Sequence, residues 1–175
     1  GTVPLVIVLI FNSWMSKLFA LTGFIGFALI VNGTLLFASD KLITAGKKNS
    51  RNMSLTDALV IGLAQACAVI PGISRSGTTI TVGMSRGLSR SYAMRFSLLL
   101  SIPAVLGSLL VSLAKAISAG VNWGYFPAYL IGMIFAAATG FAAISILGRI
   151  VRKGKFGKMA YYCWGIGALT LLLSI

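Results

Sequence analysis

A short polar segment, residues 71–77, interrupts an otherwise apolar stretch that runs from about residue 55 to residue 84. Its Arg75 has no acidic residue nearby in the sequence and is flanked by Ser74 and Ser76. An ionisable group inside a membrane-like segment is costly and usually serves a function. A guanidinium, hydroxyls and glycine-exposed backbone N–H groups are donors suited to phosphate. We therefore expect Arg75, Ser74 and Ser76 to act on an anionic group.

The composition defines the class of protein that must position these residues. The 175 residues are 58% hydrophobic and 10% charged, with a mean hydropathy of +0.97. Several apolar runs approach the roughly 20 residues that span a bilayer. These runs are continuous, whereas a membrane β-barrel needs alternating apolar and polar residues. The sequence predicts an all-α, polytopic helical integral membrane protein.

The charge is strongly asymmetric, with 15 lysines and arginines against two acidic residues, Asp40 and Asp57, and no histidine. The basic residues fall in short loops between apolar runs, as the positive-inside rule requires. This distribution argues against a nucleic-acid partner. Cys67 and Cys163 lie in different apolar segments without redox or ligand spacing, so neither a disulfide nor a metal site is expected from them.

We expect one membrane domain, residues 1–175, with five transmembrane segments, at residues 2–11, 18–39, 96–117, 127–147 and 160–175. The first is too short to span and lacks the pattern of a signal peptide, which suggests a piece of a longer protein. Small residues recur on the third and fourth of these segments and predict close helix packing. Asn32 is expected to bond between helices and not to belong to the site.

Residues 55–87 form a different kind of element. About 33 residues are too many for one straight span and too few for two, and Pro71–Gly72 breaks them in the middle. Twelve of the fifteen basic residues lie in loops 40–54, 86–95 and 149–158. A re-entrant hairpin places all three loops on one, cytoplasmic face. We predict half-helices at residues 56–70 and 78–87, with Arg75 between them at membrane depth.

The expected second half-helix begins at Gly77–Thr78, beside Arg75. Its positive dipole end and free N–H groups then face the same place as the guanidinium. The hydroxyls of Thr78 and Thr79 add further donors. Discontinuous membrane helices with N-termini facing anionic groups mark substrate sites, so an anionic head group is the expected guest.

A longer pattern surrounds the polar segment, comprising Ala64, Gln65, residues 70–80, residues 87–90, Phe96, Ser97 and Pro103. It resembles the second signature of the undecaprenyl-diphosphate phosphatases, the bacitracin-resistance membrane family, and covers their C-terminal two-thirds. The resemblance implies a hydrolase of the bacterial plasma (inner) membrane. It would convert undecaprenyl diphosphate to undecaprenyl phosphate and recycle the lipid carrier for peptidoglycan. It also implies that the chain is half of an inverted repeat.

The resemblance further implies roles for single residues. Arg75 would neutralise charge on the transferred phosphoryl group, and Ser74, Ser76 and Thr79 would donate hydrogen bonds. Gly72, Gly77 and Thr78 would complete the phosphate-binding loop, with the glycines allowing close approach of the backbone. A divalent cation, Mg²⁺ or Ca²⁺, would take its ligands from an N-terminal segment with acidic residues and a histidine. This chain lacks that segment, so we expect it to be inactive alone.

Two other functions stay open at this level. A lipid-phosphate flippase or anion transporter could use the same site without breaking a bond, because re-entrant hairpins and inverted repeats also occur in transporters. A structural membrane subunit is the second alternative. The sequence leaves a homodimer open.

Overall fold

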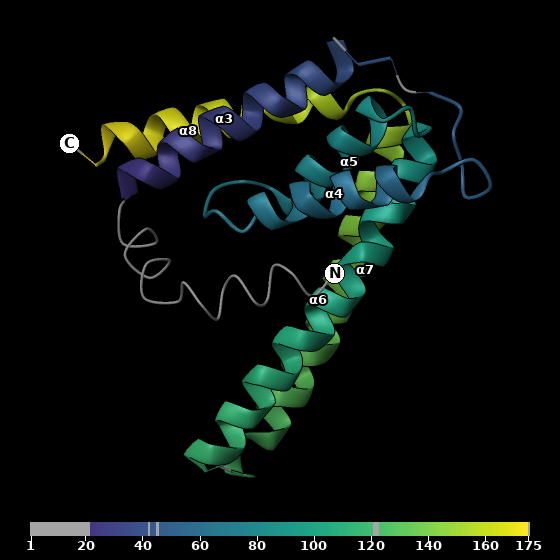
Figure 1. Cartoon of the computed structure of the whole chain (residues 1–175). Helices are drawn as coiled ribbons and strands as arrows, with labels where there is room; N and C mark the ends of the chain where they lie inside the picture. The colour runs from purple at the N-terminus through teal and green to yellow at the C-terminus, as the bar shows by residue number, and fades with distance from the viewer. Residues whose placement is uncertain (1–21, 42, 45, 121–122, 175) are drawn as a thin grey trace.

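The computed structural model describes residues 22–41, 43–44, 46–120 and 123–174, and within these ranges the chain is helical, without a β-strand. The expected first segment, residues 2–11, lies outside the described residues. The elements are α3 (Thr22–Lys41), α4 (Leu55–Cys67), α5 (Arg75–Ser85), α6 (Arg90–Ala119), η1 (Trp123–Tyr125), α7 (Phe126–Arg152), η2 (Phe156–Lys158) and α8 (Met159–Leu172) (Figure 1).

Three of these helices, α3, α6 and α7, are long and apolar enough to cross a bilayer. The pair α6 and α7 extends away from the other helices, and its apolar side chains are largely exposed (Figure 1). Leu99 and Phe135, for example, are 60% and 67% exposed. Such surfaces suit contact with lipid tails and not with water. The structure therefore confirms the predicted all-α, polytopic membrane class.

Helices α3 and α8 pack side by side in antiparallel directions (Figure 1). Glycines let the two backbones approach closely. A Cβ at Gly26 would lie 2.9 Å from the carbonyl oxygen of Gly167, and a Cβ at Gly167 would lie 2.8 Å from that of Gly26. Real Cβ atoms do not come so close to a carbonyl, so both positions need glycine. This is the close approach that small residues provide between membrane helices.

The predicted stripes of small residues on α6 and α7 give a mixed result. Ser97 and Ala104 are buried on α6, while Ser108 farther along is exposed. On α7, a Cβ at Gly132 or Gly140 would meet nothing within 4 Å among the described residues. Close packing along the whole stripe therefore stays a prediction. Among the described residues, α6 is buried only along its first half, and α7 is buried only in its last turns.

Helices α4 and α5 form the predicted hairpin, at 55–67 and 75–85 instead of 56–70 and 78–87. Its two ends meet at Asp57, near the start of α4. The Asp57 carboxylate accepts hydrogen bonds from Lys48 Nζ at 2.9 Å and from Arg86 Nε, just after α5, at 3.0 Å. Chain entry and exit therefore lie at the same end of the hairpin. A single straight helix through residues 55–87 would have separated these groups.

Asp57 also organises the start of α4. Its carboxylate accepts from the Ser54 N–H, and the Ser54 hydroxyl accepts from the Asp57 N–H, which is a capping box. The hydrogen bond from Lys48, followed by that from the Ser54 N–H, holds the pKa of Asp57 well below its usual range. A lowered pKa means that this stabilisation is present above about pH 4 and is lost as the pH falls further.

The second acidic residue, Asp40, joins the other basic loops. Its carboxylate forms an ion pair with Arg90 at the start of α6 and accepts a hydrogen bond from the Gly157 N–H at 2.6 Å. Gly154 also lies close to the Arg90 guanidinium. With Lys48 bonded to Asp57, the three predicted basic loops, 40–54, 86–95 and 149–158, lie together at one end of the structure.

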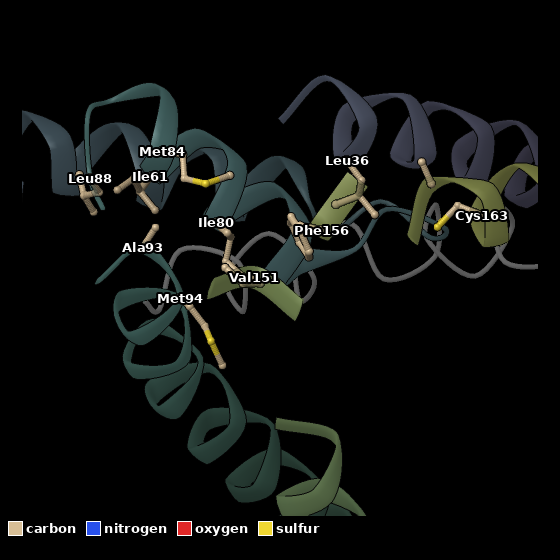
Figure 2. Close-up of a cluster of buried hydrophobic side chains, with 11 residues drawn as sticks. Leu36, Ile61, Ile80, Met84, Leu88, Ala93, Met94, Val151, Phe156 and Cys163 are labelled. Carbon is tan, nitrogen blue, oxygen red and sulfur yellow. The ribbon is translucent and has the colours of Figure 1, made fainter. Parts of the chain in front are cut away.

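A cluster of buried apolar side chains joins the hairpin to the helices around it (Figure 2). Ile61 of α4 and Ile80 and Met84 of α5 are at most 1% exposed and form its centre. The rest of the cluster comes from the other helices and, for Leu88, from the connection between α5 and α6: Leu36, Leu88, Ala93, Met94, Val151, Phe156, Ala160 and Cys163. The hairpin is thus held on its surroundings by apolar packing as well as by its ion pairs.

We predict that Gly167→Ala destabilises the protein. The added methyl group must displace the α3 backbone at Gly26, and overpacking of this kind typically costs about 1–3 kcal/mol. Gly165→Ala on the same helix is the matched control, because a Cβ there meets nothing within 4 Å. The measurement is the thermal unfolding temperature in detergent. Equal stability of both variants would contradict the close α3–α8 packing.

Candidate functional site

The tip of the hairpin is fixed to α3 through Gly72. This residue has φ = +91°, a left-handed conformation that favours glycine. A Cβ there would also lie 2.7 Å from the Cβ of Ala28 and 3.0 Å from the carbonyl oxygen of Ile25. Backbone conformation and packing against α3 therefore explain Gly72. The approach to a phosphate that the sequence suggested is not needed to explain this glycine.

Asn32 of α3 holds the same loop by hydrogen bonds. Its side-chain oxygen accepts from the Ser74 N–H at 3.0 Å, and its amide nitrogen donates to Cys163 Sγ of α8 at 3.4 Å. Asn32 is 3% exposed. The interhelical role expected for Asn32 is confirmed, and the structure also places Asn32 in the lining of the cavity beside the loop. Asn32 and Ser74 are 42 residues apart, so no local sequence pattern could have predicted their hydrogen bond.

Helix α5 begins at Arg75, three residues before the predicted start, because Ser74 is its N-cap. The Ser74 hydroxyl accepts from the Gly77 N–H at 3.1 Å. The hydroxyl keeps its own hydrogen free for donation. Gly77 lies tightly between Ser74 and α3, since a Cβ would come within 3.0 Å of both the Ser74 hydroxyl and Leu36.

The N-terminus of α5 presents several donors without protein acceptors. Among the described residues, none accepts from the backbone N–H groups of Arg75 and Ser76. The Arg75 guanidinium is exposed and makes no hydrogen bond or ion pair there, and the Ser76 hydroxyl has no partner in the same residues. Free N–H groups at a helix start, a guanidinium and a hydroxyl together can bind an oxyanion.

The two threonines are placed differently. The Thr78 hydroxyl donates to the Ser74 carbonyl at 3.0 Å, and the Thr79 hydroxyl bonds the Arg75 carbonyl at 3.0 Å and the Ser97 hydroxyl of α6 at 2.6 Å. Both threonines are buried. Direct phosphate binding by Thr78 and Thr79 stays a prediction, while the geometry shows them fixing the start of α5 and joining it to α6.

A cavity of about 360 Å³ adjoins the donors. Ser74, Ser76 and Gly77 line one side of it. The remaining lining residues come from α3, α7, η2 and α8 and are mostly apolar: Asn32, Leu36, Leu147, Phe156, Met159, Tyr162 and Cys163. A mainly apolar hollow with a few convergent polar groups is typical of a small-molecule site. This one suits a ligand with an anionic head and an apolar body.

Neither acidic side chain reaches this loop. Asp57 lies at the far end of α4, about 15 Å from its last turn at 1.5 Å per residue. Asp40 is engaged with Arg90 and Gly157. Within the described ranges, no group of three or more histidine, cysteine or acidic residues could hold a metal ion. The residues at hand therefore do not fit the divalent cation that the sequence resemblance implies.

These features define a class: a polytopic helical membrane protein whose helical hairpin presents a helix start with unpaired donors beside a mainly apolar cavity. Comparison with known proteins identifies the family within this class. The chain belongs to the bacitracin resistance protein BacA family, whose model matches residues 1–169. This result confirms the resemblance seen around residues 71–77.

Curated relatives share the name undecaprenyl-diphosphatase. A protein of Halothermothrix orenii is 41% identical over 99% of this chain and 67% of its own length. One of Methanobrevibacter smithii is 39% identical over the whole chain and 63% of its own length. A protein of Methanothermobacter thermautotrophicus is 36% identical, and the alignment covers 97% of it. The chain thus spans about two thirds of two of these relatives and nearly all of the third.

We predict that Asn32→Leu destabilises the protein. The substitution keeps the volume but leaves the partly buried Ser74 N–H without its acceptor, and an unsatisfied buried donor typically costs about 1–3 kcal/mol. Thr170→Val serves as the control, because that hydroxyl bonds only the Ile166 carbonyl of its own helix. Thermal unfolding in detergent measures the effect. An Asn32→Leu protein as stable as Thr170→Val would show that the Asn32–Ser74 bond does not hold the loop.

Proposed function

We propose that this protein supplies the diphosphate-binding half of an undecaprenyl-diphosphate phosphatase. The reaction would be hydrolysis of undecaprenyl diphosphate to undecaprenyl phosphate and inorganic phosphate. One observation carries the proposal: unpaired N–H groups and the Ser76 hydroxyl lie at the start of α5 beside a mainly apolar cavity, and the exposed Arg75 belongs to the same helix turn. The family and the names of the relatives support the same substrate class.

In this proposal the terminal phosphate binds at the start of α5. The Arg75 guanidinium contacts its non-bridging oxygens and offsets the charge that develops during transfer, since phosphoryl transfer depends mainly on positioning and electrostatic stabilisation. The Ser74 and Ser76 hydroxyls and the free N–H groups donate to the same oxygens. The first isoprene units occupy the cavity beside Leu147 and Met159.

The nucleophile's base and the ligands of a divalent cation are not among the described residues. We assign them to the part of the longer relatives that this chain leaves uncovered. A bound cation would add positive charge at the phosphate. No step through it follows from this chain's own residues.

We further propose that the three basic loops face the cytoplasm. Joined at Asp40 and Asp57, they form one strongly basic end, which the positive-inside rule places on that side. Helix α4, with 13 residues, reaches about 20 Å at 1.5 Å per residue. This length would carry the loop at Gly72 to Arg75 well into a hydrocarbon core about 30 Å thick.

The function is tested with two proteins. The 175-residue chain should bind undecaprenyl diphosphate in detergent without releasing phosphate. The same chain, extended by the part of the Halothermothrix orenii relative that the alignment leaves uncovered, should release phosphate. Arg75→Lys keeps the charge but loses the planar fork. It should weaken binding about tenfold and slow phosphate release about 100-fold or more, as does the loss of other transition-state donors.

Arg51→Lys is the control, because Arg51 lies exposed in a basic loop and its guanidinium is unbonded within the described residues. Unchanged rates for Arg75→Lys would remove Arg75 from the mechanism. Phosphate release by the 175-residue chain alone would show that the base lies within it. Movement of the lipid diphosphate from one leaflet of a vesicle membrane to the other, without phosphate release, would favour the transporter alternative.

The orientation is tested by cysteine labelling in intact cells, in a chain without Cys67 and Cys163. Cysteines at Asn49, Ser91 and Gly154 should resist a membrane-impermeant thiol reagent, whereas one at Ala119, at the far end of α6, should react. Labelling at Ser91 but not at Asn49 would place the two ends of the hairpin on opposite faces, which the bonds of Asp57 to Lys48 and Arg86 do not allow.

A further inference from the structure

Another hollow, of about 200 Å³, lies between α6 and α7 at the basic end of the structure. It is several times larger than the roughly 30 Å³ that a water molecule occupies in the liquid. Ser91 and Arg95 line it from α6, and Ser145 and Arg152 line it from α7. Met94 and Ile144 supply its apolar part. It shares no lining residue with the cavity at the hairpin tip.

The spacing of these residues places them on facing sides of the two helices. Ser91 and Arg95 are four residues apart, and Ser145 and Arg152 are seven apart, so each pair shares one helix face. Gly148 lies between the latter two. A Cβ there would approach Met94 Cε to 3.1 Å and Arg152 Nη2 to 3.7 Å. The glycine thus lets Met94 pack closely on α7 and leaves room for the Arg152 guanidinium.

The donors of this hollow have no acceptors in the described part of the chain. There, neither Arg95 nor Arg152 makes an ion pair or side-chain hydrogen bond, and the Ser91 and Ser145 hydroxyls have no partner. Both carboxylates of the sequence are engaged elsewhere, Asp57 with Lys48 and Arg86 and Asp40 with Arg90. The positive charge of the two arginines is therefore not compensated by the protein.

We infer that this hollow binds the head group of an anionic phospholipid. Two guanidiniums and two hydroxyls match the oxygens of a phosphodiester. Basic pockets between membrane helices on the cytoplasmic side are suited to anionic lipid head groups. Apolar side chains on the same helices, such as Ile144 and Leu99, are 46% and 60% exposed and provide a surface for the acyl chains.

The experiment measures binding of phosphatidylglycerol to the protein in detergent by native mass spectrometry, with phosphatidylcholine as the reference lipid. The wild type should retain phosphatidylglycerol at least tenfold more tightly than phosphatidylcholine. Arg95→Gln/Arg152→Gln should weaken phosphatidylglycerol binding at least tenfold. Lys47→Gln/Arg51→Gln removes the same charge from an exposed loop and should change it less than twofold. Ser91→Ala/Ser145→Ala keeps both positive charges and introduces only alanine, which is favourable in a helix. It should weaken phosphatidylglycerol binding several-fold.

Four outcomes would overturn the inference. Equal losses in the two charge variants would mean general surface attraction, and unchanged binding in the serine variant would mean that no built site exists. If millimolar inorganic phosphate displaced bound phosphatidylglycerol as effectively as added phosphatidylglycerol does, the hollow would be a site for a free anion. The Arg75→Gln variant tests whether the lipid binds at the hairpin tip instead. It should bind phosphatidylglycerol with unchanged affinity, and a loss of affinity would place the lipid at Arg75.

Discussion

The placement of the candidate site depends on one buried carboxylate. Asp57 joins a lysine of one basic loop to an arginine at the start of the next, and it caps the helix between them. With this junction, residues 55–87 must turn back, and their midpoint becomes the tip of a hairpin. Arg75 then lies at a helix start and not within a continuous helix. The unpaired donors at the tip follow from that turn.

The scarcity of acidic groups makes such junctions effective. In a chain with 15 basic residues, each of the two carboxylates collects several donors from distant segments. Asp57 closes the hairpin, and Asp40 holds α3, α6 and the segment before α8 together. Other basic residues, such as Arg75 at the start of α5 and Arg95 and Arg152 between α6 and α7, have no carboxylate partner among the described residues.

Rigidity at the hairpin tip comes from α3 and α8. Gly26 and Gly167 let these helices touch, and this contact brings Asn32 and Cys163 to the loop. Thr79 and Ser97 fasten the other side of α5 to α6. The loop is therefore held from both sides by bonds to the Ser74 N–H and the Thr79 hydroxyl, which leave the Arg75 guanidinium and the Ser76 hydroxyl without a partner among the described residues.

The sequence by itself determined the membrane class, the hairpin and the residues of its tip, because hydropathy, a central Pro71–Gly72 break and loop charge are local properties. Helix boundaries were less accessible: α5 begins earlier than predicted because Ser74 caps it, and α6 begins at Arg90 because Ser89 caps a polar first turn that hydropathy does not register. Only the tertiary structure decided that Asn32 bonds the loop, that Gly72 is required by α3, and that Thr79 bonds α6. Each depends on contacts between residues distant along the chain, which local patterns do not encode.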